Sequence, residues 1–280
     1  MAGTDERAVA AADDALYVLT AVLLTPAQFP SVLGDDYPAA CAVLGLPPLA
    51  DGYGLVLGQD GDGARWTVVI DDVALVAVAI ASWDCGMEYE LSPDEDAVVT
   101  ALPGWPLAVA VAAPGVPAPH DPPAEPAGRP ALSPPDTGSW GPAQRRLGAD
   151  EIALQWSAWR EQIADADFRA PGGPAKGAPP AQGGEEGPAR GGHAGVRRVL
   201  AEARAYVDSP PPLGRVRSSF APGDARTLRA DGPGWSLVAR TDDIAFVLLD
   251  DEPGEVHPVG RGPELPGLLE ALDKMAVRPL

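Results

Sequence analysis

The sequence predicts an α+β protein made of two small modules, each an antiparallel sheet with helices on one side. Short runs rich in Val and other strand-forming residues alternate with turns that contain Asp and Gly, and amphipathic segments flank these runs. Two stretches dominated by Pro, Ala and Gly divide the chain, because such a composition buries too little apolar area to offset the entropy of ordering. The expected division is an acidic α+β domain over residues 1–113, a linker over 114–149, a helix over 150–169, a second linker over 170–195 and a second α+β domain over 196–280.

The first domain is expected to begin with two helices. A helix is predicted over residues 5–24, because Thr4 is a suitable N-cap and an apolar stripe follows it. The stripe consists of Leu16, Leu19, Leu23 and Leu24. A shorter helix is predicted over residues 36–44, with Pro38 in its first turn. Residues 53–57 then favour a short strand.

The centre of the first domain is a pair of apolar, β-branched runs. Trp66–Ile70 and Val73–Ala81 are predicted to be strands, joined by a hairpin at Asp71-Asp72. Ser92 is a suitable N-cap for a further helix. The elements expected after the hairpin are an edge strand over residues 84–90, a helix over 92–102 and a buried strand over 107–113.

The second half of the chain is expected to contain three amphipathic helices and a set of short strands. In the helix predicted over residues 150–168, Trp156 and Trp159 lie on one face and need burial, for which we expect the protein's own fold rather than a partner. The other expected elements are helices over residues 196–207 and 264–275 and strands over 215–220, 226–229, 235–240 and 244–249.

The two halves share an order of sequence signals. In each, a Pro-Pro-Leu segment leads to a strand, an Asp-Gly turn, a Trp that opens the next strand, an Asp pair and a Pro-led helix. These signals include Trp66 with Asp71-Asp72, and Trp235 with Asp242-Asp243. We treat this order as a hypothesis of internal duplication, in which both Trp side chains pack under a helix at equivalent positions. Chance is the alternative, because the composition is rich in Pro, Gly and Asp.

The net charge of −20 is concentrated in the first half of the chain. Residues 1–140 contain 20 acidic and 3 basic residues, a net of −17, whereas residues 141–280 contain 20 acidic and 17 basic residues, a net of −3. An acidic surface repels phosphate backbones, so we expect no direct nucleic-acid binding. A basic protein partner fits this charge, and the alternative is a surface that simply keeps the protein in solution.

The sequence contains no motif that indicates catalysis or a cofactor. Walker A, HExxH and nucleophile-elbow patterns are absent, and Cys41 and Cys85 make neither a disulfide framework nor a zinc site. Two of the three histidines, His120 and His193, fall in the expected linkers, where a general base is difficult to preorganise. We therefore expect no cofactor and no resident metal.

The expected compartment is the cytoplasm, with no membrane partner. The N-terminus lacks the positive charge of a secretory signal, and no apolar run approaches the roughly 20 residues that span a bilayer. Arg exceeds Lys, and Ala, Gly and Pro are abundant, which is typical of a GC-rich coding sequence and favours a bacterial origin.

Clustered carboxylates are the densest groups of reactive side chains. Our leading hypothesis is a non-enzymatic interaction protein, immunity- or antitoxin-like or regulatory, whose acidic first domain binds a basic partner. The candidate binding residues are Asp71, Asp72, Glu88, Glu90, Asp94 and Asp96. Two alternatives stay open: a metal-assisted enzyme that uses the first four of these carboxylates, and a nucleic-acid mimic that occupies a DNA-binding protein.

Overall fold

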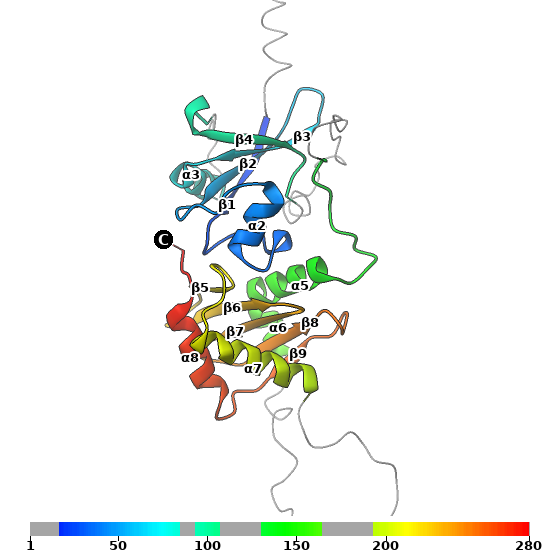
Figure 1. Cartoon of the computed structure of the whole chain (residues 1–280), viewed down its shortest axis with the longest axis vertical. Coiled ribbons are helices and arrows are strands. Elements are labelled where there is room, and N and C mark those ends of the chain that lie inside the picture. Colours follow the sequence, from blue (N-terminus) through cyan, green and yellow to red (C-terminus); the bar gives the residue numbers. More distant parts are fainter. Residues whose placement is uncertain (1–16, 85–92, 107–129, 164–192, 280) are drawn as a thin grey trace, which may run out of the picture.

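Two antiparallel sheets with flanking helices form an α+β fold, which confirms the predicted fold class. The computed structural model describes residues 17–84, 93–106, 130–163 and 193–279. The first sheet has four strands and the second has five, and within each sheet neighbouring strands follow the order of the chain. Figure 1 shows the sheet of strands β1–β4 in the upper half of the molecule and the sheet of strands β5–β9 in the lower half.

The first half confirms the short helix and two of the strands that the sequence predicts. Its elements are β1 (Tyr17–Leu24), η1 (Ser31–Leu33), α2 (Tyr37–Leu44), β2 (Tyr53–Gln59), β3 (Arg65–Ile70), α3 (Val73–Asp84), η2 (Glu95–Ala97) and β4 (Val98–Pro103). Helix α2 begins after Asp36, whose Oδ1 accepts a hydrogen bond from the backbone N–H of Ala39 at 2.7 Å. It ends at Gly45, which adopts the left-handed conformation with a φ of 67° that favours glycine.

The helix predicted over residues 5–24 is wrong in its described part, because residues 17–24 form strand β1. This strand pairs with β2 in antiparallel register, with Leu24 opposite Tyr53. The leucine spacing suits a helix, but the Tyr, Val and Thr of the same run favour a strand, and pairing with β2 decides between the two. Residues 5–16 lie outside the described residues.

The strand predicted over Val73–Ala81 is also wrong, because this run lies in helix α3. The Asp71-Asp72 pair forms no hairpin; the Oδ1 of Asp72 instead accepts hydrogen bonds from the backbone N–H of Ala74 (3.0 Å) and of Leu75 (3.1 Å), which caps the helix. Alanine, the strongest helix former, alternates with the β-branched residues of this run and offsets their preference. Strands β2 and β4 pair with the two sides of β3, so residues 73–81 cannot pair with β3 as a hairpin strand.

The helix predicted over residues 92–102 is replaced by the 3₁₀ turn η2 and strand β4. Strand β4 pairs with β3, and Ala101 lies opposite Val68. The run Val98-Val99-Thr100 is β-branched, so its local preference agrees with the sheet once β3 is there to pair with it. Ser92, most of the strand predicted over residues 84–90 and the strand predicted over 107–113 lie outside the described residues.

The first sheet is covered on both faces. Adjacent residues of β2 point to opposite sides: Leu55 belongs to a core with α2 and η1, and Val56 belongs to a core with α3. The core on the α2 side includes Leu24, Phe29, Tyr37, Leu44, Tyr53 and Val69, and the core on the α3 side includes Ala21, Val68, Ile70, Val76 and Ala79. The helices therefore lie on both sides of this sheet and not on one side alone.

The second half confirms the predicted strands and the helices predicted over residues 196–207 and 264–275, and adds one short strand. Its elements are α5 (Pro142–Leu154), α6 (Trp156–Glu161), α7 (Ala194–Asp208), β5 (Val216–Phe220), β6 (Arg226–Gly232), β7 (Trp235–Arg240), β8 (Ala245–Leu249), β9 (His257–Val259) and α8 (Leu265–Met275). Helices α7 and α8 cover one face of the sheet, with Leu237 and Val247 in their core. Sequence reasoning missed β9, because three residues that include a proline carry no strand signal.

The helix predicted over residues 150–168 is two helices, α5 and α6, and α5 begins earlier, at Pro142. They cover the second face of the second sheet. Trp156 and Trp159 pack edge-on against Phe246, with ring centroids 5.3 Å and 6.4 Å away. Both therefore pack within the protein's own fold, Trp156 buried and Trp159 partly buried. Residues 164–168 lie outside the described residues, and the division of the chain into domains and linkers stays a prediction.

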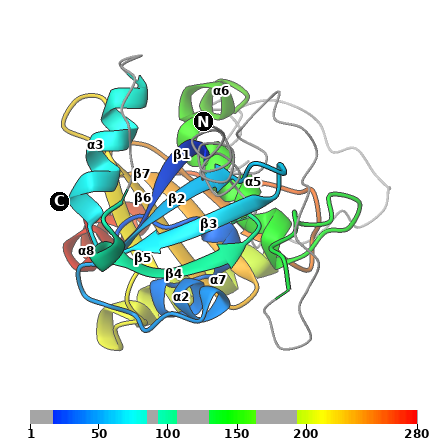
Figure 2. The same ribbon diagram turned by 90° about the horizontal axis from the view of Figure 1, so that it is seen from above.

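The two halves are in contact through α5, η1 and the start of α2. Figure 1 shows α2 and α5 at the level between the two sheets, and Figure 2, seen from above, shows strands β1–β4 lying over the second sheet. Helix α5 packs against η1 on one side and against β7 and β8 on the other. The backbone N–H of Tyr37 also donates to the carbonyl oxygen of Leu213 at 3.0 Å. Residues from both halves are therefore needed to bury α5.

The structure does not confirm the internal duplication. Asp71-Asp72 leads into helix α3, whereas Asp242-Asp243 lies in the tight turn between strands β7 and β8. Trp235 is fully buried in the core of the second half, whereas Trp66 is partly exposed. The two Trp residues share a place after a hairpin turn but not a packing environment.

Candidate functional site

Five carboxylates gather at one edge of the first sheet. Antiparallel pairing places Ile70, the last residue of β3, opposite Val98, and the backbone N–H of Asp71 donates to the carbonyl oxygen of Ala97 at 3.1 Å. The end of β3, the start of α3 and the η2 turn before β4 therefore meet at one place. We call the exposed carboxylates at this place the acidic edge: Asp71, Asp72, Asp94, Glu95 and Asp96.

The acidic edge is not neutralised by a described cation. In the parts of the chain that the structure describes, none of its five carboxylates makes an ion pair. Arg65 is the one Lys or Arg within residues 17–84 and 93–106, and it is buried, with its guanidinium 5.0 Å from the ring centroid of Trp105. The negative potential of the edge therefore extends into solvent, where dissolved salt screens it.

Helix α3 presents apolar side chains to solvent beside the acidic edge. Val76 and Ala79 are buried against the sheet, whereas we define the outer face of α3 by four exposed residues: Ala74, Ala77, Val78 and Ala81. Val78 is 46% exposed. A helix that is apolar all round is normally buried on all sides, and contiguous exposed apolar surface marks interaction sites. Figures 1 and 2 both place α3 at the periphery of the first half.

The structure brings together four of the six binding residues predicted from the sequence. Asp71, Asp72, Asp94 and Asp96 all belong to the acidic edge, and Glu88 and Glu90 lie outside the described residues. Glu95 was missed as a candidate, although it lies between two residues that were named. The pairing of β3 with β4 brings the two acidic segments together. Because the sequence predicts a helix over residues 92–102, it could not indicate this pairing.

A second group of reactive side chains lies at the start of α7. The Nε2 of His193 is 3.0 Å from Oε1 of Glu252, and the Nε2 of His257 is 2.7 Å from Oε2 of the same carboxylate. The two imidazole rings stack, with centroids 4.3 Å apart and planes inclined by 21°. One donor atom of each residue lies within 4.8 Å of the other two, so these side chains could share a metal ion. We call them the His-Glu-His cluster.

Sequence reasoning missed the His-Glu-His cluster because it assigned His193 to a linker. In the structure His193 is instead the N-cap residue of α7, and its Nδ1 accepts a hydrogen bond from the backbone N–H of Val196 at 3.4 Å. Pairing of β9 with β8 places His257 opposite Val247. The cluster therefore depends on the register of β9, a three-residue strand that was not predicted. The signal in the sequence was the position of His193 directly before an amphipathic helix, which is the N-cap position.

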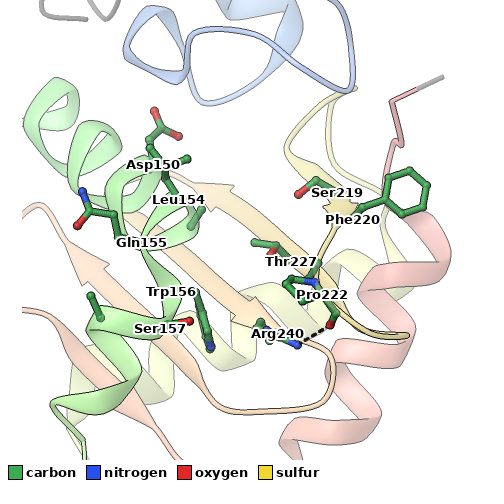
Figure 3. Close-up of a pocket in the computed structure, with 13 residues that line it drawn as sticks. Asp150, Leu154, Gln155, Trp156, Ser157, Ser219, Phe220, Pro222, Thr227 and Arg240 are labelled. Atoms are coloured by element: carbon green, nitrogen blue, oxygen red, sulfur yellow. Dashed lines mark hydrogen bonds between the residues drawn. The ribbon is translucent and has the colours of Figure 1, made fainter. Parts of the chain in front are cut away.

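A groove of about 750 Å³ separates the α5–α6 segment from the β5–β6 connection. Figure 3 shows Leu154 and Trp156 on one side of it and Phe220, Pro222 and Thr227 on the other. The charged groups that line it already have partners: Asp150 accepts hydrogen bonds from Ser31 and Arg229, and Arg240 donates to the carbonyl oxygen of Pro222 at 3.1 Å and to Asp242. The lining residues include the hydroxyls of Ser157, Ser219 and Thr227 but no His or Cys, so the groove has neither an imidazole base nor a thiol.

The contact between the halves contains a charge-balanced network that we call the ionic interface. It consists of Arg145, Arg146, Arg215, Arg217, Arg229, Asp35, Asp36, Asp150, Asp231 and Asp250. The Arg145 side chain is fully buried and donates to Asp250 (2.6 Å), Ser236 (2.6 Å) and Asp35 (3.2 Å). Burial by itself raises the pKa of the Asp231 carboxyl, but the guanidinium groups of Arg229 and Arg217 outweigh it and hold this pKa below its ordinary value. Each member of the network pairs with another member, which indicates a structural role.

The thiol of Cys41 has no catalytic environment. Cys41 is fully buried in the core beside α2, and burial raises the pKa of its thiol above the ordinary value, an effect that a hydrogen bond with Tyr37 partly offsets. A nucleophilic cysteine needs the opposite shift and access to substrate. Cys41 is therefore a small core residue.

No known protein family, curated protein or solved structure matches this chain. Among the described residues, no helix has the length and apolar character needed to cross a bilayer. The candidate sites therefore rest on the geometry of this chain alone.

Proposed function

We propose that this chain is a non-enzymatic interaction protein of the bacterial cytoplasm that binds a basic protein partner. The binding surface consists of the acidic edge and the outer face of α3. The observation that supports it is the juxtaposition of five exposed carboxylates, without a described counter-cation, and an exposed apolar helix face. Asp72 connects the two features, because it is part of the acidic edge and caps α3.

The chemistry of this surface specifies its partner. Charge complementarity speeds encounter and sets orientation, whereas apolar burial supplies affinity at about 25 cal/mol per Å² removed from water. A surface with both features side by side suits a partner whose Lys or Arg side chains flank an apolar stripe. A basic amphipathic helix has this arrangement, and it can lie along α3 with its charged residues at the acidic edge.

The test uses a helical probe peptide with Leu on one face and Lys on its flanks, and a second peptide in which Glu replaces Lys. We expect the Lys peptide to bind the full-length protein at low ionic strength and to weaken as salt rises, and the Glu peptide not to bind. The variant Asp94→Asn/Glu95→Gln/Asp96→Asn should weaken binding by about tenfold or more, since removing one close charge pair costs on the order of 1 kcal/mol. Fluorescence anisotropy at two salt concentrations measures both effects.

A matched triple variant separates a specific surface from net charge. Asp208→Asn/Asp224→Asn/Glu161→Gln changes the charge by the same amount at three exposed positions of the second half. We expect its affinity for the Lys peptide to stay within about twofold of the parent protein, because these sites lie in another half and surface charge is screened beyond about 10 Å. Equal losses in the two triple variants, or no binding of the Lys peptide at low salt, would show that the acidic edge serves solubility alone.

A further inference from the structure

We propose that the His-Glu-His cluster binds one divalent transition-metal ion, with Zn²⁺ as the representative ion. The ligands are His193, Glu252 and His257. This site is separate from the acidic edge and does not depend on the proposed function. Two imidazoles and one carboxylate are the donor set of open zinc sites and of other borderline divalent metals, and hard cations such as Mg²⁺ and Ca²⁺ prefer oxygen ligands alone.

Rigid elements hold the three side chains together without a metal. His257 is fixed by the pairing of β9 with β8. Glu252 lies in the tight β8–β9 connection, where its N–H donates to the carbonyl oxygen of Leu249 and its carbonyl oxygen accepts from the N–H of Glu255, both at 3.3 Å. His193 is held at the first turn of α7, and Figure 1 shows this end of α7 next to β9.

Gly195 allows α7 to approach the sheet closely enough to form the cluster. A Cβ at position 195 would come within 2.4 Å of the Cδ1 of Leu249, so a larger residue would displace the Leu249 side chain or the start of α7. The first turn of α7 therefore packs directly on the end of β8, two residues after His193.

Two buried polar atoms of the cluster lack hydrogen bonds. The Oε2 of Glu252 and the Nε2 of His257 are inaccessible to solvent and have no hydrogen-bond partner, although they lie 2.7 Å apart. The two atoms are thus close but not aligned for an N–H···O bond. Buried groups of this kind normally cost stability, and a shared metal ion would satisfy both.

The cluster also has an opening to solvent. The side chain of His257 is 14% exposed, that of Glu252 is 29% exposed and that of His193 is 40% exposed. An ion can therefore enter from the His193 side, and three protein ligands leave at least one coordination position of a tetrahedral ion for water.

Metal binding through Nε2 of His193 changes the cap of α7. In the cap contact Nδ1 is the acceptor, so the proton of neutral His193 is on Nε2; coordination at Nε2 moves that proton to Nδ1 and removes the acceptor. The hydrogen bond given up is long, at 3.4 Å, so its loss costs little against the metal bond that replaces it. The bound ion would tie the start of α7 to the β8–β9 connection.

The test is isothermal titration of the full-length protein with Zn²⁺, with Ca²⁺ as the hard-cation control. We expect one Zn²⁺ per chain, a rise in melting temperature that the chelator EDTA reverses, and no comparable effect of Ca²⁺. His193→Ser should weaken Zn²⁺ binding by at least about tenfold while keeping the helix, because Ser is a favoured N-cap. Glu252→Gln should do the same with almost no change in shape.

Two control variants locate the ion. His120→Ala removes the remaining histidine of the chain, and Asp94→Asn/Glu95→Gln/Asp96→Asn removes charge from the acidic edge; both should keep parental Zn²⁺ affinity. His257→Gln is a second ligand variant, and its melting curve without metal reports whether it folds. Failure to saturate at one ion, or binding that is unchanged in both His193→Ser and Glu252→Gln, would overturn the proposal.

Discussion

At the scale of single residues, Trp66 near the start of β3 and Trp235 at the start of β7 have different environments. Trp235 is fully buried, its Nε1–H donates to Oε2 of Glu202 at 2.6 Å, and its ring stacks on Tyr206 with centroids 5.9 Å apart. Trp66 is partly exposed, and its Nε1–H donates to Oδ2 of Asp60 at 2.9 Å. This hydrogen bond is the main reason that the pKa of Asp60 lies below its ordinary value.

We therefore predict unequal effects of truncating the two tryptophans. Trp235→Ala should lower the free energy of unfolding by about 3–5 kcal/mol, since it leaves a cavity in the core and a carboxylate of Glu202 without its donor. Trp66→Ala should lower the free energy of unfolding by about 1–2 kcal/mol, because the partly exposed Trp66 side chain buries less apolar area than that of Trp235. Chemical denaturation of both variants measures the difference. Equal losses of stability would instead support the duplication hypothesis, in which Trp66 and Trp235 occupy equivalent positions.

At the scale of elements, sequence reasoning succeeded where local preference and position in the fold agree. Strands β2, β3 and β5–β8 and helices α2, α7 and α8 were predicted, because each has a periodic apolar pattern and clear ends, such as Asp36 and Gly45 around α2. It failed for β1, α3 and β4. These three depend on which strand pairs with which, and the sequence alone does not show pairing.

The same limit explains the candidate sites. The acidic residues of the edge could be named from the sequence, but their meeting at one edge follows from the register of β3 with β4, where Ile70 lies opposite Val98. Predicting the His-Glu-His cluster would have required both the register of β8 with β9 and the position of α7 against the sheet. Candidate residues were thus partly predictable, and their convergence was not.

Helix α3 offers a direct prediction about an element that was misread as a strand. Asp72→Ala should lower the free energy of unfolding by about 1 kcal/mol, because the Asp72 carboxylate accepts from two backbone N–H groups at the start of the helix. Asp71→Ala is the matched control, since its side chain makes no such contact in the described structure and should cost little. Urea denaturation compares them. If the two variants are equally stable, Asp72 does not cap α3.

At the scale of the whole molecule, the ionic interface joins what composition suggests are two separate modules. Asp36 of the first half pairs with Arg215 of the second at 3.1 Å, and the guanidinium of Arg217 lies 4.2 Å from the ring centroid of Phe29. A sequence rich in Pro, Ala and Gly between the halves gives no sign of these contacts. Removing one partner of a buried charge pair is costly, because the other charge is left buried without compensation.

Arg145 provides the sharpest test of this coupling, with its neighbour Arg146 as the control. Arg145 is fully buried on α5 and bonds Asp35 of the first half as well as Ser236 and Asp250 of the second, whereas Arg146 pairs with Asp35 at 3.5 Å and is partly exposed. Arg145→Ala should cost roughly 3–5 kcal/mol, because it leaves buried acceptors without a donor, and Arg146→Ala should cost less than about 1 kcal/mol. Calorimetry should show one melting transition for the parent protein and a single, lowered transition for Arg145→Ala, since both halves lose a shared partner. Two transitions, with the loss confined to one of them, would show that the halves unfold independently and that the ionic interface does not couple them.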